Sequence, residues 1–164
     1  MEIKTPNQKR NRGEASVELE EIKNNTQRKI GRNILLFQEM EHLVKSLVFT
    51  GKMEGFASEF EANQKKRGEA IHKQTLGKVV RRHLKNTHSE ENEVEFKDGY
   101  VSITFELSDA YYKRKKQTLD SLVAERNDLV HHLFPRINPD SAENWIEVER
   151  YLDNQREKLL PELD

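Results

Sequence analysis

The chain has 164 residues, which is enough for one domain of ordinary size and too few for two full ones. Charged residues make up 35% and hydrophobic residues only 34%, so we expect a thin core, and 28 basic against 29 acidic groups leave no overall charge that favours nucleic acid. The absence of cysteine excludes disulfide scaffolds, thiolate zinc sites, iron–sulfur clusters and thiol nucleophiles.

The first residues, 1–14, are polar and charged, and their one aliphatic side chain is Ile3. Such a segment cannot bury enough apolar surface to offset its loss of conformational freedom, so we expect a flexible polar tail followed by one domain over 15–164. The tail lacks the apolar stretch of a signal peptide, and no apolar run approaches the ~20 residues of a membrane span. We therefore expect a cytoplasmic protein that does not bind membranes.

From Ala15 to Thr50 apolar residues recur at helical spacing, and Gly51 is a suitable end for such a helix. The main stripe consists of Ile30, Ile34, Phe37, Val44 and Val48, with Leu36, Met40, Leu43 and Leu47 beside it. Asparagine and glycine have low helix propensity, so Asn24 and Gly31 leave open whether the segment forms one long helix or two.

The middle of the chain is more polar. Residues 52–74 contain few bulky apolar side chains, and we expect a mobile loop with short helical pieces there. A short helix is predicted over 75–84, and its buried side consists of Leu76, Val79, Val80 and Leu84. Between 93 and 107 apolar and polar residues alternate on both sides of Asp98-Gly99, which predicts a β-hairpin.

Two further helices are predicted. The first runs from its N-cap, Ser108, to about Phe134, because Pro135 disfavours helical geometry in the residue before it. Asp140 and Glu143 form a capping box that opens a last helix. The apolar stripe of this last helix consists of Trp145, Val148, Leu152 and Leu159. The expected fold is mainly all-α, a small up-down bundle of about four main helices with a β-hairpin insertion.

One position breaks the apolar seam of the helix that starts at Ser108. The seam consists of Leu119, Leu122, Leu129 and Leu133, and Arg126 stands where another leucine would complete the heptad pattern. An arginine keeps its charge at physiological pH, so burial in such a seam is costly unless it is paired or hydrated. Asn127 follows Arg126, and His131 lies one turn after Asn127 on the same face. A local failure of the apolar pattern often marks a functional site.

A guanidinium, an amide and an imidazole on one helix suit the cleavage of a phosphodiester. Arginine presents a rigid fork of donors that matches phosphate oxygens and can stabilise charge on a pentacoordinate phosphorus. Histidine, with an ordinary pKa of about 6.5, can take a proton from a ribose 2′-hydroxyl or give one to the leaving oxygen. This chemistry requires no metal or other cofactor. Because five residues span about 140° of helix, Arg126 and His131 converge only across a groove or with a second copy of the helix.

The motif from Arg126 to His131 reads Arg-Asn-x-x-x-His, near the end of an amphipathic helix in a small helical bundle. It resembles the signature of the HEPN superfamily, which is Arg, four to six residues, then His, commonly with a polar residue after the Arg. Residues 30–45 also look like the long opening helix of such domains, so the resemblance covers about 15–160.

The resemblance implies a homodimeric, metal-independent endoribonuclease, frequently a toxin or antiviral-defence effector, with a possible antitoxin or defence-system partner protein. By position it makes Arg126 and His131 catalytic and Asn127 a supporting member of the same site. Leu133 stands where some members carry a tyrosine that a partner enzyme modifies, so we do not expect regulation by that route.

Each candidate also has a structural interpretation. Arg126 can be a structural cation held by Glu41 of the first helix, and this is compatible with a role for Glu41 in orienting Arg126. His131 can be a capping or surface histidine. Asp128 can pair with His132 one turn on, or bias the protonation of the cluster. No spacing of histidines or carboxylates indicates a metal site, so we assign none.

Two basic clusters are candidates for contacts with the RNA backbone. They consist of Lys113, Arg114, Lys115 and Lys116, about three turns before the motif, and of a group on the short helix that includes Arg81 and Arg82. In a chain this rich in charge a solvated face is the simpler interpretation, whereas a track for RNA would make binding steeply salt-dependent.

Three hypotheses follow from these residues. The first is an endoribonuclease in which attack by the 2′-hydroxyl leaves a 2′,3′-cyclic phosphate and a 5′-hydroxyl. The second is a catalytically silent HEPN-like adaptor that binds RNA or a partner protein through the same groove. The third is a structural helical dimer in which a pair between Arg126 and Glu41 specifies register.

Overall fold

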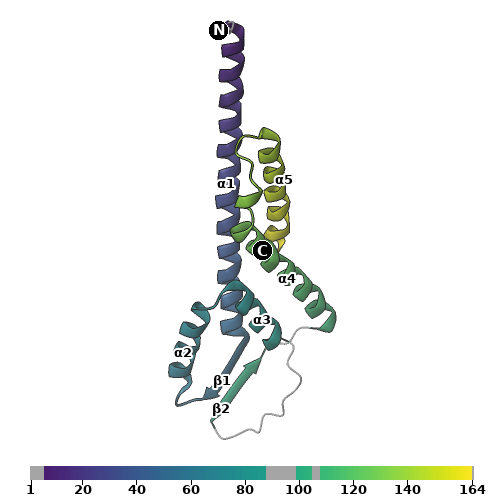
Figure 1. The fold of residues 1–164 in the computed structure, drawn as a ribbon. Coiled ribbons are helices and arrows are strands. Elements are labelled where there is room, and N and C mark those ends of the chain that lie inside the picture. Colours follow the sequence, from purple (N-terminus) through teal and green to yellow (C-terminus); the bar gives the residue numbers. More distant parts are fainter. Residues whose placement is uncertain (1–5, 88–98, 105–107, 164) are drawn as a thin grey trace. The chain divides into compact units, whose positions relative to one another are not determined.

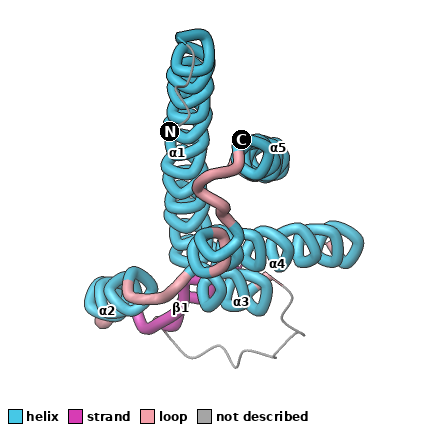
Figure 2. Tube along the Cα trace, turned by 45° about the horizontal axis from the view of Figure 1, so that its top comes forward, coloured by secondary structure: helices cyan, strands magenta, loops and turns pink. Residues whose placement is uncertain are grey.

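In a computed structural model of the protein, residues 6–87, 99–104 and 108–163 are described, without the side chains of 6–15 and 104. Most of this part of the chain is helical (Figure 2). In chain order the elements are α1 (Pro6–Gly51), β1 (Lys52–Phe56), α2 (Phe60–His72), α3 (Leu76–Asn86), β2 (Tyr100–Thr104), α4 (Asp109–His131) and α5 (Ala142–Leu159) (Figure 1). β1 and β2 form a two-stranded antiparallel sheet, so the predicted fold class, mainly α-helical with a small β element, is confirmed. None of the helices within these ranges is long and apolar enough to cross a membrane.

The chain divides into two compact units, and α1 and α4 each contribute to both. The first, called here the α1–α5 unit, comprises residues 1–37 and 126–162 and contains the start of α1, the end of α4 and all of α5. The second, called the sheet unit, comprises residues 38–125 and contains the remaining elements. Each unit buries apolar side chains of its own.

In the α1–α5 unit, α5 runs beside the middle of α1 (Figure 1). The predicted stripe of α5 is confirmed, because Trp145, Val148, Leu152 and Leu159 are all buried. Phe37 of α1 and Leu129 of α4 are buried in the same unit. The start of α5 corrects the prediction by one residue: the N-cap is Ser141, not Asp140, because the Oγ of Ser141 accepts a hydrogen bond from the backbone N–H of Asn144 at 3.2 Å.

In the sheet unit, the buried apolar side chains come from α1, α2, α3 and α4. They are Met40, Val44, Val48, Ile71, Leu76, Val79, Val80, Leu84, Leu119 and Leu122, which confirms the predicted buried side of α3. Gly77 lets α3 approach α4 closely, because a Cβ at this position would lie 3.3 Å from Cγ1 of Val123. Leu43 and Leu47, predicted to lie beside the buried stripe of α1, have exposed side chains.

Residues 52–74 were expected to form a mobile loop with short helical pieces. The helical part of this prediction is confirmed by α2, whereas the loop expected before it is the strand β1. β1 pairs with β2 so that Phe56 lies opposite Tyr100, and their rings pack edge to face with centres 5.4 Å apart. A short strand whose partner is distant in the chain has little local signal, which is why the sequence pattern missed it. Residues 93–97, the other arm of the predicted hairpin, lie outside the described residues.

Two helix boundaries also differ from the prediction. α1 is one continuous helix that begins at Pro6, inside the segment 1–14 expected to be a polar tail. Contacts with α5 offset the low helix propensity in the middle of α1, since Asn25 donates to a carboxylate of α5 at 2.6 Å. α4 ends at His131 rather than near Phe134, whose side chain is 87% exposed.

Candidate functional site

The candidate motif occupies the last turns of α4, within the α1–α5 unit. The leucine seam anchors this helix end, because Leu129 in the helix and Leu133 just after it are buried. Arg126 is half-buried, whereas the side chains of Asn127 and His131 are exposed. The helix therefore presents an amide and an imidazole to solvent and an arginine at the edge of the core.

Arg126 and Asn127 interact directly, since Nη1 of Arg126 donates to Oδ1 of Asn127 over 3.3 Å. This bond occupies the acceptor of the amide, so its NH₂ group and the other guanidinium N–H groups are the donors that suit an anion. His131 is the last residue of α4, and its ring centre lies 6.3 Å from that of His132. In the described ranges no hydrogen bond joins His131 to Arg126, as expected for side chains about 140° apart on one helix.

Asp128 has partners other than those predicted. Its carboxylate accepts hydrogen bonds from Arg136 at 2.5 Å and from the hydroxyl of Tyr151 at 2.9 Å, and it does not pair with His132. The Nε of Arg136 also donates to the backbone carbonyl of His132 at 3.1 Å, and its guanidinium lies over the ring of Tyr151. A guanidinium fixed in this way is a better partner for the carboxylate than an exposed imidazole. Arg136 and Tyr151 thereby tie the end of α4 to α5.

These contacts shift the pKa values of the groups involved. Burial alone would raise the pKa of Asp128, but the hydrogen bonds from Tyr151 and Arg136 outweigh it and hold this pKa below its ordinary value. The charge of His132 acts in the same direction on Asp128. Burial and the hydrogen bond to Asp128 raise the pKa of Tyr151 to about 12, so the phenol stays protonated and continues to donate to the carboxylate.

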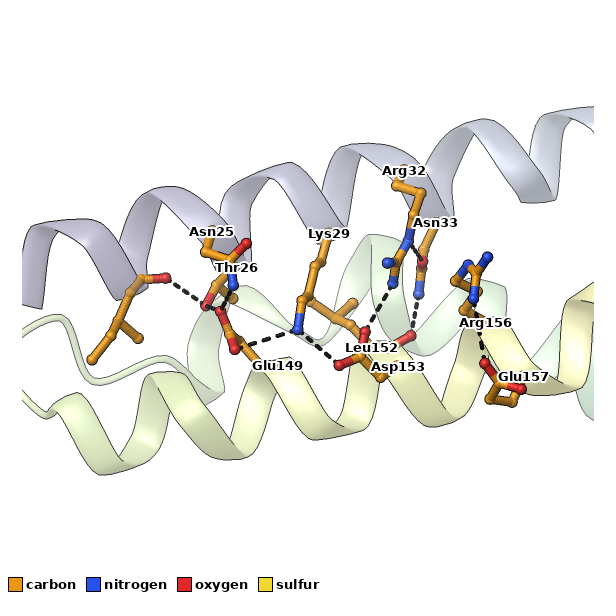
Figure 3. A network of polar contacts seen from close by, with 11 residues as sticks. Asn25, Thr26, Lys29, Arg32, Asn33, Glu149, Leu152, Asp153, Arg156 and Glu157 are labelled. Carbon is orange, nitrogen blue, oxygen red and sulfur yellow. Dashed lines mark hydrogen bonds and ion pairs between the residues drawn. The ribbon is translucent and has the colours of Figure 1, made fainter.

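Polar contacts continue from Tyr151 along α5 to α1. The amide of Gln155 donates to the hydroxyl of Tyr151 at 3.1 Å and accepts from Nδ2 of Asn33 at 3.0 Å. Nδ2 of Asn33 also donates to the backbone carbonyl of Leu152 at 2.7 Å (Figure 3). Asn33 and Gln155 are both buried. The helix that carries the candidate motif is therefore linked to α1 through a continuous chain of hydrogen bonds.

The exposed edge of the same helix pair carries ion pairs (Figure 3). Nζ of Lys29 lies 2.7 Å from Asp153 and 3.3 Å from Glu149, and Arg32 lies 3.2 Å from Asp153. The hydrogen bond from Lys29 lowers the pKa of Asp153, burial opposes this shift, and Arg32 reinforces it.

This lowered pKa predicts an acid-sensitive contribution to stability. A carboxyl group whose folded pKa is depressed contributes stability that is present above its unfolded pKa of about 3.9 and is lost as the pH falls through the folded pKa. Between about pH 5 and pH 2 we expect the Tm of the wild type to fall more steeply than that of Asp153→Asn, which cannot titrate. Thermal unfolding followed by circular dichroism measures both slopes. Asp140→Asn, at an exposed position, should keep the wild-type slope, and equal slopes for all three proteins would contradict the prediction.

Arg136 and Tyr151 are not among the predicted site residues. Tyr151 precedes Leu152 and lies three residues after Val148, so helical periodicity places it at the edge of the buried stripe of α5. That spacing could have identified Tyr151 as a residue that faces the rest of the unit. Arg136 follows Pro135 in a short turn, where periodicity identifies no partner.

Glu41, the predicted partner of Arg126, belongs to the sheet unit. Its carboxylate accepts a hydrogen bond from Nζ of Lys45 at 2.7 Å, and Lys45 also donates to the backbone carbonyl of His72 at 3.0 Å. A pair between Glu41 and Arg126 would join the two units, and it stays a prediction.

The basic residues predicted to bind RNA also lie in the sheet unit. They are Lys113, Arg114, Lys115 and Lys116 on α4, and Arg81 and Arg82 on α3. Lys116 pairs with Asp120 at 2.6 Å, and such an exposed pair contributes little to stability. Burial and the charge of Lys115 on α4 lower the pKa of His83 on α3. The two helices that carry the basic clusters approach closely at Gly77 and Val123.

The described ranges hold no group of three or more histidine or carboxylate side chains that could bind a metal ion. Compared with protein-family models, curated proteins and solved structures, the chain matches none of them.

Proposed function

We propose that the protein is a metal-independent endoribonuclease of the HEPN type, acting as a toxin or antiviral-defence effector in the cytoplasm. The observation that carries this proposal is the end of α4, where a guanidinium, an amide and an imidazole occupy one short stretch. The bond between Arg126 and Asn127 groups their remaining N–H donors, which is an arrangement suited to phosphate oxygens. The exposed imidazole of His131 is accessible to a substrate.

In the proposed reaction, the ribose 2′-oxygen forms a bond to the adjacent phosphorus while the bond from phosphorus to the 5′-oxygen breaks. His131 takes the proton of the 2′-hydroxyl or returns one to the leaving 5′-oxygen. Arg126 stabilises the negative charge of the phosphorane, and Asn127 holds the scissile phosphate or the imidazole. The products are a 2′,3′-cyclic phosphate and a 5′-hydroxyl.

Two features support a homodimer that binds RNA. Arg126 and His131 lie about 140° apart on one helix. Two α4 helices that face each other would bring Arg126 of one chain close to His131 of the other. Exposed Lys113 and Arg114 precede the motif on the same helix and offer cations to the RNA backbone. An antitoxin or another defence-system protein would then control the activity.

The test is RNA cleavage by the purified protein in an excess of EDTA, followed by analysis of the new RNA ends. We expect products with 2′,3′-cyclic phosphate and 5′-hydroxyl ends, because the mechanism uses the substrate's own 2′-hydroxyl. Products with 3′-hydroxyl ends would contradict it. A protein that binds RNA under these conditions without cutting it would be the HEPN-like adaptor, which is the alternative function.

A further inference from the structure

The sheet unit contains a hollow of about 770 Å³ whose lining residues come from β1, α2 and α3. Five of the lining side chains are cationic, namely Lys52, Arg67, Arg81, Arg82 and Lys85. Among the lining residues the only carboxylate is Glu54, and it is already paired with Lys52 at 3.2 Å. The described surface of this hollow is therefore strongly positive.

Arg67 is held in place by a hydrogen bond to the backbone. Its Nη2 donates to the backbone carbonyl of Val48 at 2.7 Å, which fixes the guanidinium against the wall. Burial and the charge of Arg82 both lower the pKa of Arg67, and the opposing effect of Glu54 is smaller. Arg67 and Arg82 are both half-buried and line the same hollow, so their like charges repel each other and an anion bound in the hollow would reduce that repulsion.

We propose that this hollow binds a phosphate group through Arg67, Arg82 and Lys85. Guanidinium forks match phosphate oxygens in geometry, and the bond to Val48 holds the fork of Arg67 in place before the ligand arrives. A concave surface with one sign of charge also raises the local concentration of anions. The same phosphate oxygens are presented by a free oligophosphate and by the backbone of a single-stranded nucleic acid.

None of the residues of the hollow belongs to the motif on α4, so the phosphate site does not require nuclease activity, although Arg81 and Arg82 are also among the residues predicted to contact RNA. The experiment therefore uses two probes that a 2′-hydroxyl-dependent nuclease cannot cleave. The first is inorganic tripolyphosphate, titrated into the full chain by calorimetry. The second is a fluorescein-labelled 2′-O-methyl oligouridine, followed by fluorescence anisotropy.

The main variant is Arg67→Gln/Arg82→Gln. Because Arg67 also bonds to a backbone carbonyl, Arg82→Gln/Lys85→Gln provides a second variant that leaves this contact intact. The matched control is Lys66→Gln/Lys78→Gln, which removes the same formal charge from exposed positions on α2 and α3 that do not line the hollow. Circular dichroism confirms that each protein is folded.

We expect each hollow variant to bind at least one probe about tenfold or more weakly than the wild type, with the control within about twofold of it. Tighter binding of tripolyphosphate than of the oligonucleotide would assign the site to a free oligophosphate, and tighter binding of the oligonucleotide would assign it to a nucleic-acid backbone. Both outcomes support the phosphate site. Binding of neither probe by the wild type would overturn the proposal. Equal losses in the hollow variants and the control would also overturn it, because they would reflect charge alone.

Discussion

Replacing His131 with alanine is expected to reduce the rate of RNA cleavage in EDTA by about a hundredfold to ten-thousandfold, because the variant has no group to move the proton. Replacing Arg126 with alanine is expected to reduce it by about a hundredfold to a thousandfold through loss of charge stabilisation in the transition state. Both residues lie at the end of α4, where the side chain of His131 is exposed and that of Arg126 is half-buried. Initial rates on a labelled RNA measure the loss.

Matched controls are available in the same chain. His72 is exposed and is the last residue of α2, as His131 is of α4, and the contact to its backbone carbonyl survives His72→Ala. Arg150 is exposed on α5, so Arg150→Ala is the matched control for Arg126→Ala. We expect His72→Ala and Arg150→Ala to cleave at the wild-type rate. His131→Ala that cleaves as fast as His72→Ala would contradict the assigned role of His131.

Mixing the two inactive proteins tests whether a second chain completes the site. If Arg126 of one chain acts with His131 of another, mixed dimers of Arg126→Ala and His131→Ala contain one site with both groups intact. Activity should then reappear on mixing, while each variant alone stays inactive. The absence of any recovery, with exchange of chains shown by sedimentation of labelled protein, would contradict a site shared between chains.

Replacing Asn33 with alanine is expected to lower the free energy of unfolding by about 2–4 kcal/mol. The side chain is fully buried, with 0% exposure, and its amide donates to Gln155 at 3.0 Å and to the carbonyl of Leu152 at 2.7 Å. Removing it leaves a cavity and removes the hydrogen bond that Asn33 donates to the buried amide oxygen of Gln155. Urea denaturation followed by circular dichroism measures the change.

Two further variants make this prediction specific to the buried contact. Asn154→Ala, at an exposed position on α5, should change stability by less than about 0.5 kcal/mol. Asn33→Leu/Gln155→Met replaces both partners with apolar groups of similar shape and should recover part of the loss, because no polar atom of that pair is then left unsatisfied. If Asn33→Ala were no less stable than Asn154→Ala, the network of Figure 3 would not hold α1 and α5 together.

The helices α3, α4 and α5 were predictable because their signal is local. The stripe of α5 and the leucine seam of α4 repeat with the helical period, and their members, from Leu119 to Leu159, are buried as the pattern requires. The pairing of β1 with β2 was not predictable in this way, since it joins residues 52–56 to residues 100–104. A strand whose pairing depends on a distant segment shows only weak alternation in its own sequence.

The same distinction between local and distant contacts explains which parts of the candidate site were predictable. Arg126 is noticeable in the sequence because a cation interrupts a leucine seam. In the structure this residue is half-buried at the edge of the core, which reduces the cost of burying its charge. The partners of Asp128 were not predictable, because the turn after α4 carries Arg136 to the carboxylate and packing of α5 carries Tyr151 to it. Sequence spacing alone favours a neighbour one turn away, and here tertiary contacts override it.

The proposed nuclease activity is tested by one cleavage experiment in which wild type and His131→Ala, both shown by circular dichroism to be folded, act on the same RNA in an excess of EDTA. The quantity to measure is the number of 2′,3′-cyclic phosphate ends formed. The motif at the end of α4 predicts many such ends with the wild type and almost none with the variant. Equal numbers from both proteins, or none from either protein while both bind the RNA, would contradict a nuclease centred on Arg126 and His131.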